Sequence, residues 1–275
     1  MTTAPIAVIT GAARGIGRQL ATDLLVRGYR VVIGDLDLAA TEATAAELGA
    51  GASAVQLDVT DRDRISAVIT EVEATVGPIA LWINNAGIMP TGYFTSQPVG
   101  QLRTTIDIDY AAVVEATHAI LPLMLGRGSG TIVNLASATG IKPLSGLAAY
   151  SGAKAAVIAF SDALRREIRG SGVQITVIMP NLVTTAMGAG ITPPALTGSV
   201  TAATVSAAVM RALDRGTFAV VVPRRLGPIL RLSKLLPVRL QDWIDDRAGS
   251  DQIGLGGDPA ARAAYLRDAL TKNQP

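Results

Sequence analysis

The chain of 275 residues is 49% hydrophobic and 17% charged, which is enough apolar material to bury a sizeable core. It contains no cysteine and one histidine, so disulfides, cysteine nucleophiles, histidine triads and histidine-rich metal sites are excluded, and we expect no metal. The net charge of +2 is too small to indicate a nucleic-acid partner.

Nothing in the sequence predicts export or a membrane span. The N-terminus runs into a strand-like segment without the basic and apolar regions of a signal peptide. We find no uninterrupted apolar run long enough to cross a bilayer. We therefore expect a soluble, cytoplasmic protein, and the lack of cysteine is compatible with that reducing compartment.

Strand and helix patterns alternate from the N-terminus to about Val222 with no linker between them. Such alternation predicts one α/β domain built on a parallel sheet. We therefore expect a single domain over residues 1–275, with the alternating core at 1–222 and a helical extension at 223–275.

The first turn carries a glycine pattern typical of phosphate binding. Residues 5–10 form a short apolar run, as in a strand buried on both faces, and a helix follows. Between strand and helix lie Gly11, Arg14, Gly15, Ile16 and Gly17. Glycines here let the backbone approach a pyrophosphate, and the helix N-terminus presents free N–H groups to it. The strand–turn–helix context predicts a dinucleotide site.

The second strand, residues 30–34, ends in Asp35, eighteen residues beyond Gly17. An acid near this position binds the adenosine ribose hydroxyls in dinucleotide sites, although Asp35 could instead be a turn or cap residue. Its carboxylate would repel the 2′-phosphate of NADP by roughly 4 kcal/mol at ~4 Å. Arg14 favours NADP, because a basic residue in the turn can contact that phosphate. Asp35 lies at the ribose itself, so we expect NAD rather than NADP.

Polar residues also follow the next two strands. Asp58 and Val59 close the strand at 53–57, and the run Asn84 to Gly87 follows the strand at 79–83. Ligands of open α/β sheets bind at this carboxyl edge. Adjacent asparagines are equally compatible with a plain turn.

The strand at 130–136 leads to Ser137, and the helix at 148–168 carries Tyr150 and Lys154. The tyrosine and the lysine are four residues apart, so they share one helix face. An ammonium favours a phenolate and lowers the phenol pKa from its usual value near 10. Such a group suits acid–base work on an alcohol or ketone, with Ser137 as a further polar contact. Taken alone, the pair would be a solvated helix face.

The remaining core elements are a helix at 101–125 with Pro122 near its end, a strand at 174–179, a helix at 202–215 and a strand at 218–222. Residues 187–200, which are small and weakly charged, predict a loop that covers the substrate and becomes ordered when a ligand binds. His118 falls in a helical pattern, and we expect a structural position for it.

In combination, these motifs resemble those of the short-chain dehydrogenase/reductase family over about residues 4–222. The resemblance implies a doubly wound Rossmann sheet of seven parallel strands with helices on both faces. It also implies hydride transfer between a nicotinamide ring and a carbonyl or alcohol carbon, and assembly as a homodimer or homotetramer.

The resemblance further implies roles for single residues. Tyr150 would be the acid–base residue, Lys154 would hold the nicotinamide ribose and lower the tyrosine pKa, and Ser137 would steady the substrate oxygen. The other cofactor contacts would come from Asp58, Val59, Asn85, Ala86, Gly87, Pro180, Val183 and Thr185.

Two positions depart from the family pattern. Asp109 stands where the family commonly has a catalytic asparagine that organises a water, and Asn181 stands where a glycine usually follows the proline. The added negative charge of Asp109 beside Lys154 would raise the tyrosine pKa and move the pH optimum upward.

The extension begins with a basic amphipathic pattern over residues 224–244. Ile229, Leu232, Leu236, Leu240 and Trp243 would share one face of a helix kinked by Pro237. Such a helix could contact a membrane peripherally, but we favour its packing over the active site or at a subunit interface. A last helix is expected at 258–270, capped by Asp258 and begun by Pro259.

The sequence thus predicts an NAD-dependent oxidoreductase for a small hydrophobic secondary alcohol or ketone. The alternatives are an NADP-dependent carbonyl reductase and a dinucleotide-binding scaffold without activity, the latter suggested by Asp109.

Overall fold

The computed structural model describes residues 4–193, 198–250 and 252–271. Within them, seven parallel strands form one sheet in the order β3-β2-β1-β4-β5-β6-β7, which confirms the predicted fold class. The strands are β1 (Ile6–Thr10), β2 (Arg30–Asp35), β3 (Ala52–Gln56), β4 (Ile79–Asn84), β5 (Gly130–Leu135), β6 (Val173–Pro180) and β7 (Ala219–Val222). The order reverses next to β1, so the carboxyl ends of β1 and β4 flank a crevice where ligands bind in such sheets.

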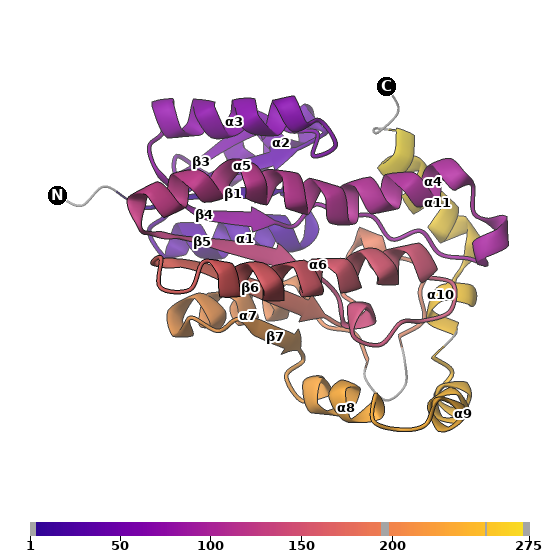
Figure 1. The fold of residues 1–275 in the computed structure, drawn as a ribbon. Coiled ribbons are helices and arrows are strands. Elements are labelled where there is room, and N and C mark those ends of the chain that lie inside the picture. The colour runs from indigo at the N-terminus through magenta and orange to yellow at the C-terminus, as the bar shows by residue number, and fades with distance from the viewer. Residues whose placement is uncertain (1–3, 194–197, 251, 272–275) are drawn as a thin grey trace.

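Helices cover both faces of the sheet (Figure 1). One layer holds α1 (Gly15–Val26), α2 (Leu38–Leu48) and α7 (Ala202–Arg215), and the other holds α3 (Arg62–Thr75), α5 (Ala112–Arg127) and α6 (Ala148–Glu167). Successive side chains of β1 point alternately toward the two helical layers. Ala7 and Ile9 face the first, whereas Ile6 and Val8 face the second. This alternation explains why the strand is apolar throughout.

The helix predicted at 101–125 is longer and less regular than expected. It consists of α4 (Val99–Ile106), a π-helical turn at Asp107–Ala111 and α5, with Pro122 inside α5 rather than near a helix end. By length and composition alone Val99–Arg127 could cross a bilayer, although Arg103, Asp107, Asp109 and Glu115 interrupt its apolar residues. In the fold, however, Ala116, Ile120 and Met124 pack on the sheet.

A buried chain of polar side chains joins β4, β5 and α6. Trp82 Nε1 donates to Asn84 Oδ1 at 2.7 Å, and Asn84 Nδ2 donates to Asn134 Oδ1 at 2.8 Å. Asn134 Nδ2 donates to Ser161 Oγ at 2.9 Å, and that hydroxyl donates to the carbonyl of Val157. Buried polar groups are costly unless paired, so this chain fixes the two strands and the helix against one another.

The C-terminal extension differs from the prediction in its first half. The expected single helix is two helices, α8 (Leu226–Ser233) and α9 (Val238–Ala248), because Pro237 lacks an N–H and its ring would clash with a preceding helical turn. Most of their large apolar side chains are exposed and none of their residues lines the cavity at the active site, so they do not roof it, while packing at a subunit interface stays a prediction.

The second half of the extension folds back on the sheet. It contains α10 (Gln252–Leu255) and α11 (Pro259–Thr271), and the Asp258 carboxylate accepts from the Ala260 N–H at 2.9 Å, as predicted for the cap. Three short helical turns complete the described elements, at Phe94–Ser96, Ala138–Gly140 and Ala186–Gly188.

Candidate active site

A cavity of about 450 Å³ opens at the carboxyl ends of the strands. Its lining includes every residue predicted to bind the cofactor or act in catalysis except Gly17 and Asp109, which lie behind the wall. The glycine turn, Asp35 and Asp58 follow or end β1, β2 and β3, on one side of β4, whereas Ser137 follows β5 on its other side and α6 carries Tyr150 and Lys154. The predicted residues are therefore brought together in the lining of one cavity, as two groups.

The glycine turn can accept a phosphate group closely. Gly11 has φ +64° and Gly15 has φ +61°, in the left-handed region that favours glycine. A Cβ on Gly17 would lie 2.6 Å from the carbonyl oxygen of Gly11, so a larger residue there would push α1 off the turn. No side chain caps the N-terminus of α1, whereas Asp37 and Asp61 cap α2 and α3. The first N–H groups of α1 are thus available to an anion.

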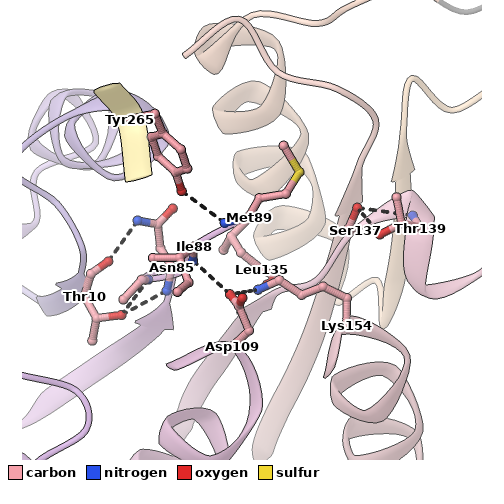
Figure 2. Close-up of polar contacts among 11 residues, drawn as sticks. Thr10, Asn85, Ile88, Met89, Asp109, Leu135, Ser137, Thr139, Lys154 and Tyr265 are labelled. Atoms are coloured by element: carbon pink, nitrogen blue, oxygen red, sulfur yellow. Dashed lines mark hydrogen bonds and ion pairs between the residues drawn. The ribbon is translucent and has the colours of Figure 1, made fainter. Parts of the chain in front are cut away.

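The turn after β4 is tied to the glycine turn. Asn85 Nδ2 donates to the carbonyls of Thr10 and Gly11, both at 2.9 Å (Figure 2). The Thr10 hydroxyl accepts from the N–H groups of Asn85 and Ala86, both at 3.0 Å. The Asn85 side chain is therefore used inside the protein, where it holds the two walls of the cavity together.

The two acids predicted near the adenosine both sit at the cavity edge. Asp35 Oδ2 accepts from the N–H of Ala13 at 3.1 Å, which fixes the carboxylate beside the glycine turn. Asp58 Oδ1 accepts from the N–H and the hydroxyl of Thr60, at 2.8 and 2.7 Å. Both carboxylates keep acceptor capacity toward a ligand, since each oxygen has two lone pairs.

In the second group, Lys154 is buried and engaged by the protein. Its Nζ lies 3.0 Å from Asp109 Oδ1 and donates to the carbonyl of Leu135 at 3.1 Å (Figure 2). The same atom lies 5.7 Å from the centre of the Tyr150 ring. Asp109 Oδ1 also accepts from the N–H of Ile88 at 3.3 Å, while Oδ2 has no partner among the described residues. The π-helical turn places this carboxylate behind the cavity wall.

The Tyr150 pKa is raised, not lowered as the spacing predicted. Burial raises it most, the charge of Asp109 raises it further, and a hydrogen bond with Ser137 lowers it. The prediction failed mainly because of that burial, and the Lys154 ammonium that was expected to lower the pKa pairs with Asp109 and Leu135 instead. Burial also raises the pKa of Asp109 to about 6, although Lys154 and the Ile88 N–H both favour its charged form.

Ser137 is the third residue of this group. It follows β5, and its hydroxyl accepts from the N–H of Thr139 at 3.2 Å and from the Thr139 hydroxyl at 3.0 Å. The next turn lies against α6: a Cβ on Gly140 would be 2.8 Å from the backbone carbonyl carbon of Lys154. The absence of a side chain at this glycine therefore lets the serine and the lysine share one site.

Apolar side chains surround the tyrosine. Met89, Leu147, Ile191 and Ile253 form a buried cluster with Tyr150, and Leu144, Leu182 and Met187 pack against it. This wall favours an apolar ligand beside the phenol. Asn181, the second departure from the family pattern, donates from its side chain to the carbonyl of Gly198 at 3.0 Å, and so joins two parts of the neighbouring loop.

Sequence reasoning missed the contribution of α11. The Tyr265 hydroxyl accepts from the N–H of Met89 at 3.0 Å, and Tyr265, Asp268 and Ala269 line the cavity. Arg262 is buried on the same helix face, and its guanidinium lies 4.7 Å from the Tyr265 ring centre. The three-residue spacing of Arg262 and Tyr265 on an alanine-rich helix is the one signal the sequence offered.

Arg262 also contacts the loop predicted to cover the substrate. It donates to the carbonyls of Met187 and Ala189 at 2.6 and 3.2 Å, and the N–H of Asp258 donates to the carbonyl of Gly190 at 2.7 Å. The start of the loop is thus held by the extension, while residues 194–197 lie outside the described part of the chain. Closure on a ligand stays a prediction.

Two further expectations concern histidine and metal. His118 is exposed on α5 and does not line the cavity. Among the residues that the structure describes, no three His, Cys, Asp or Glu side chains gather as metal ligands would.

Residues 5–195 match the family model described as short chain dehydrogenase. The chain belongs to the short-chain dehydrogenase family. It is 34% identical over 236 residues to the ketoacyl reductase HetN of a Nostoc species, covering 83% of this chain and 82% of that protein. It is 31% identical over 182 residues to the 3-oxoacyl-[acyl-carrier-protein] reductase FabG of Escherichia coli, covering 66% of this chain and 75% of that protein. Family membership makes it an oxidoreductase.

Solved structures share the fold. A short-chain dehydrogenase/reductase from Burkholderia phymatum, in complex with NAD, superposes with a TM-score of 0.79 at 23% identity, over 88% of this chain and 97% of that one. A short-chain dehydrogenase from Streptomyces avermitilis gives a TM-score of 0.75 at 28% identity, over 91% of this chain and all of that one (100%).

Proposed function

We propose that the protein transfers a hydride between NAD(H) and an apolar secondary alcohol or ketone, with Tyr150 as the acid–base residue. The observation that carries the proposal is the single cavity, which is lined by a phosphate-accepting glycine turn on one side of β4 and by a buried phenol among apolar side chains on the other.

The residues present fit a nicotinamide dinucleotide. The uncapped N-terminus of α1 and the glycine turn suit the pyrophosphate, and Asp35 suits the adenosine ribose. Lys154 would hold the second ribose, and Pro180, Val183 and Thr185 would line the nicotinamide end. The bound dinucleotide supplies the hydride acceptor or donor.

The chain itself moves the proton. During oxidation the Tyr150 phenolate takes the hydroxyl proton of the alcohol, and during reduction the phenol returns a proton to the carbonyl oxygen. Ser137 donates a hydrogen bond to the same substrate oxygen. Because burial and Asp109 raise the Tyr150 pKa, oxidation is expected to be fastest at alkaline pH.

The test of this function is a panel of secondary alcohols with NAD, read at the absorbance of NADH. Oxidation of at least one apolar alcohol that is lost in Tyr150→Phe would support the proposal. Tight NAD binding with no oxidation of any alcohol would instead support the inactive scaffold.

The preference for NAD is attributed to Asp35. In Asp35→Ala the ratio of kcat/KM for NAD to that for NADP should fall at least about tenfold, because the repulsion of a 2′-phosphate is removed. Glu42→Ala, on the exposed side of α2, is the matched control. An unchanged ratio would refute the role given to Asp35, and a wild type that turns over faster with NADP than with NAD would favour the alternative of an NADP-dependent carbonyl reductase.

A second candidate function is the reduction of a 3-ketoacyl thioester. It is favoured by the similarity to HetN and FabG, whose names specify ketoacyl reduction. Consumption of NADH or NADPH with a 3-ketoacyl thioester, faster than with any simple ketone, would select this function over the first.

A further inference from the structure

The helices α8 and α9 form a surface that the catalytic cavity does not use. They lie outside the sheet and its two helical layers (Figure 1). Neither helix contributes to the cavity lining, and no residue of α9 is buried. We call the exposed side of residues 224–244 the basic apolar face.

Large apolar side chains are concentrated on this face. Leu235 is 80% exposed and Trp243 is 57% exposed. The others that are more than a third exposed here are Ile229, Leu232, Val238, Leu240 and Ile244. A soluble monomer rarely leaves so many adjacent apolar side chains in water without a partner for them.

The two faces of α9 are segregated by charge. Leu240, Trp243 and Ile244 follow the i, i+3, i+4 spacing of one helix face. Asp242, Asp245 and Asp246 repeat the spacing two positions later, which is about 200° around the helix. Asp245 is partly buried and pairs with Lys142 of the protein body at 2.8 Å, whereas Asp242 and Asp246 are exposed, as are Leu240, Trp243 and Ile244.

The apolar side chains are accompanied by cations. Residues 224–244 contain five basic residues, Arg224, Arg225, Arg231, Lys234 and Arg239, all exposed, and one acidic residue, Asp242. Arg247 adds a guanidinium 5.4 Å from the centre of the Trp243 ring. Apolar and aromatic side chains flanked by cations are complementary to a bilayer interface that carries anionic lipids.

We propose that the basic apolar face docks the enzyme peripherally on an anionic membrane surface. The apolar side chains enter the boundary between headgroups and acyl chains, and the basic side chains contact lipid phosphates. Docking depends on this face and not on the reaction, so it does not rest on the proposed function. A second copy of the chain is disfavoured as occupant, because two such faces would bring their cations together.

The test is co-sedimentation of the full chain with vesicles of phosphatidylcholine alone, and of phosphatidylcholine mixed with phosphatidylglycerol. The wild type should bind the anionic vesicles, should bind neutral ones far more weakly, and should be released by high salt. Emission of Trp243 should shift to the blue on binding. The only other tryptophan, Trp82, is already buried and should not respond.

Two variants and their controls test the face itself. Leu235→Ser/Trp243→Ser and Arg231→Gln/Lys234→Gln/Arg239→Gln should each weaken the partition about tenfold or more. Val26→Ser, at an exposed apolar position on α1, and Arg62→Gln/Arg211→Gln/Arg215→Gln should bind as the wild type does. Alcohol oxidation in vesicle-free solution should be unchanged in all four.

Three outcomes would overturn the proposal. One is a wild type that does not bind anionic vesicles. Another is equal binding by the face variants and their controls. The third is a dimer in sedimentation that Leu235→Ser/Trp243→Ser converts to a monomer, which would assign the face to a second copy.

Discussion

Two buried cations stabilise the same short segment of the cavity wall, which contains Ile88 and Met89. Lys154 of α6 is 4% exposed and Arg262 of α11 is 5% exposed. Lys154 pairs with Asp109, which accepts from the N–H of Ile88. Arg262 donates to the carbonyl of Met89, the next residue, whose N–H donates to Tyr265.

The two cations differ in what neutralises them. Lys154 pairs with the carboxylate of Asp109, whose pKa burial raises to about 6. Arg262 meets neutral acceptors, the Thr91 hydroxyl and carbonyls on two loops, and no carboxylate of the described chain pairs with it. A guanidinium stays charged at any physiological pH. The charge on the α6 side can therefore change with pH, whereas the charge on the α11 side is constant and holds the loops in place.

The largest expected contrast is between the two tyrosines. Tyr150→Phe should reduce turnover by about 10²–10⁴-fold, since a positioned acid–base group contributes that much. Tyr265→Phe removes only an acceptor for the Met89 N–H and should reduce turnover less than about tenfold. Steady-state kinetics on both folded variants would check this, and equal losses would break the contrast.

The next effect concerns stability. Arg262→Met leaves several buried oxygens without a donor, at ~1–3 kcal/mol for each. The free energy of unfolding in urea should fall by about 3 kcal/mol, with faster hydrogen exchange in α11. Arg211→Met, at an exposed position on α7, should cost less than about 0.5 kcal/mol. A similar loss in both variants would show that the buried guanidinium has no special role.

A smaller effect should appear in the pH dependence. Asp109→Asn removes one cause of the raised Tyr150 pKa, so the pH–rate profile for oxidation should move down by about one unit. Asp107→Asn, which is exposed in the same turn, is the control. A profile identical to the wild type would refute the role given to Asp109.

Stability offers a second readout of this carboxyl. The Asp109 pKa is raised from 3.8 to about 6, so the folded state binds the proton more tightly than the unfolded state. Relative to Asp109→Asn, the wild type should therefore lose stability as pH rises through that window.

The smallest effect belongs to the surface contact between α11 and the glycine turn. Arg14 and Asp268 form an ion pair at 2.6 Å, with both side chains well exposed. Such pairs contribute at most about 1 kcal/mol, so Asp268→Asn should change the KM for NAD less than about fivefold. Glu47→Gln, which breaks the exposed pair with Arg18, should leave it unchanged. A larger effect would mean that α11 binds cofactor directly.

The sequence predicted the sheet and the site because both depend on local patterns. Apolar runs marked each strand. Gly11 and Ser137 follow strands, and Tyr150 lies in the first turn of a helix, all at the carboxyl edge of the sheet, whose geometry the fold fixes. The direction of the Tyr150 pKa could not be predicted, since it depends on the burial and on where the Lys154 ammonium points.

The extension was predicted less well. A helical pattern at 258–270 says nothing about the surface on which the helix packs, so the return of Tyr265 to the cavity was not foreseen. The pattern over 224–244 predicted one kinked helix, whereas Pro237 separates two helices. The packing of this segment was predicted from its apolar content alone. Periodicity identifies a helix, but long-range contacts decide its place.

Helix α6, which carries Tyr150 and Lys154, is fastened to one strand at two neighbouring points. Ser161 accepts from the side chain of Asn134, and Lys154 donates to the carbonyl of Leu135. A slide of α6 by one turn would break both bonds together, so only one alignment of helix and strand satisfies them. The position of the Tyr150 hydroxyl in the cavity is therefore set by the junction of helix and sheet, so a rearrangement of the surrounding loops would leave it intact.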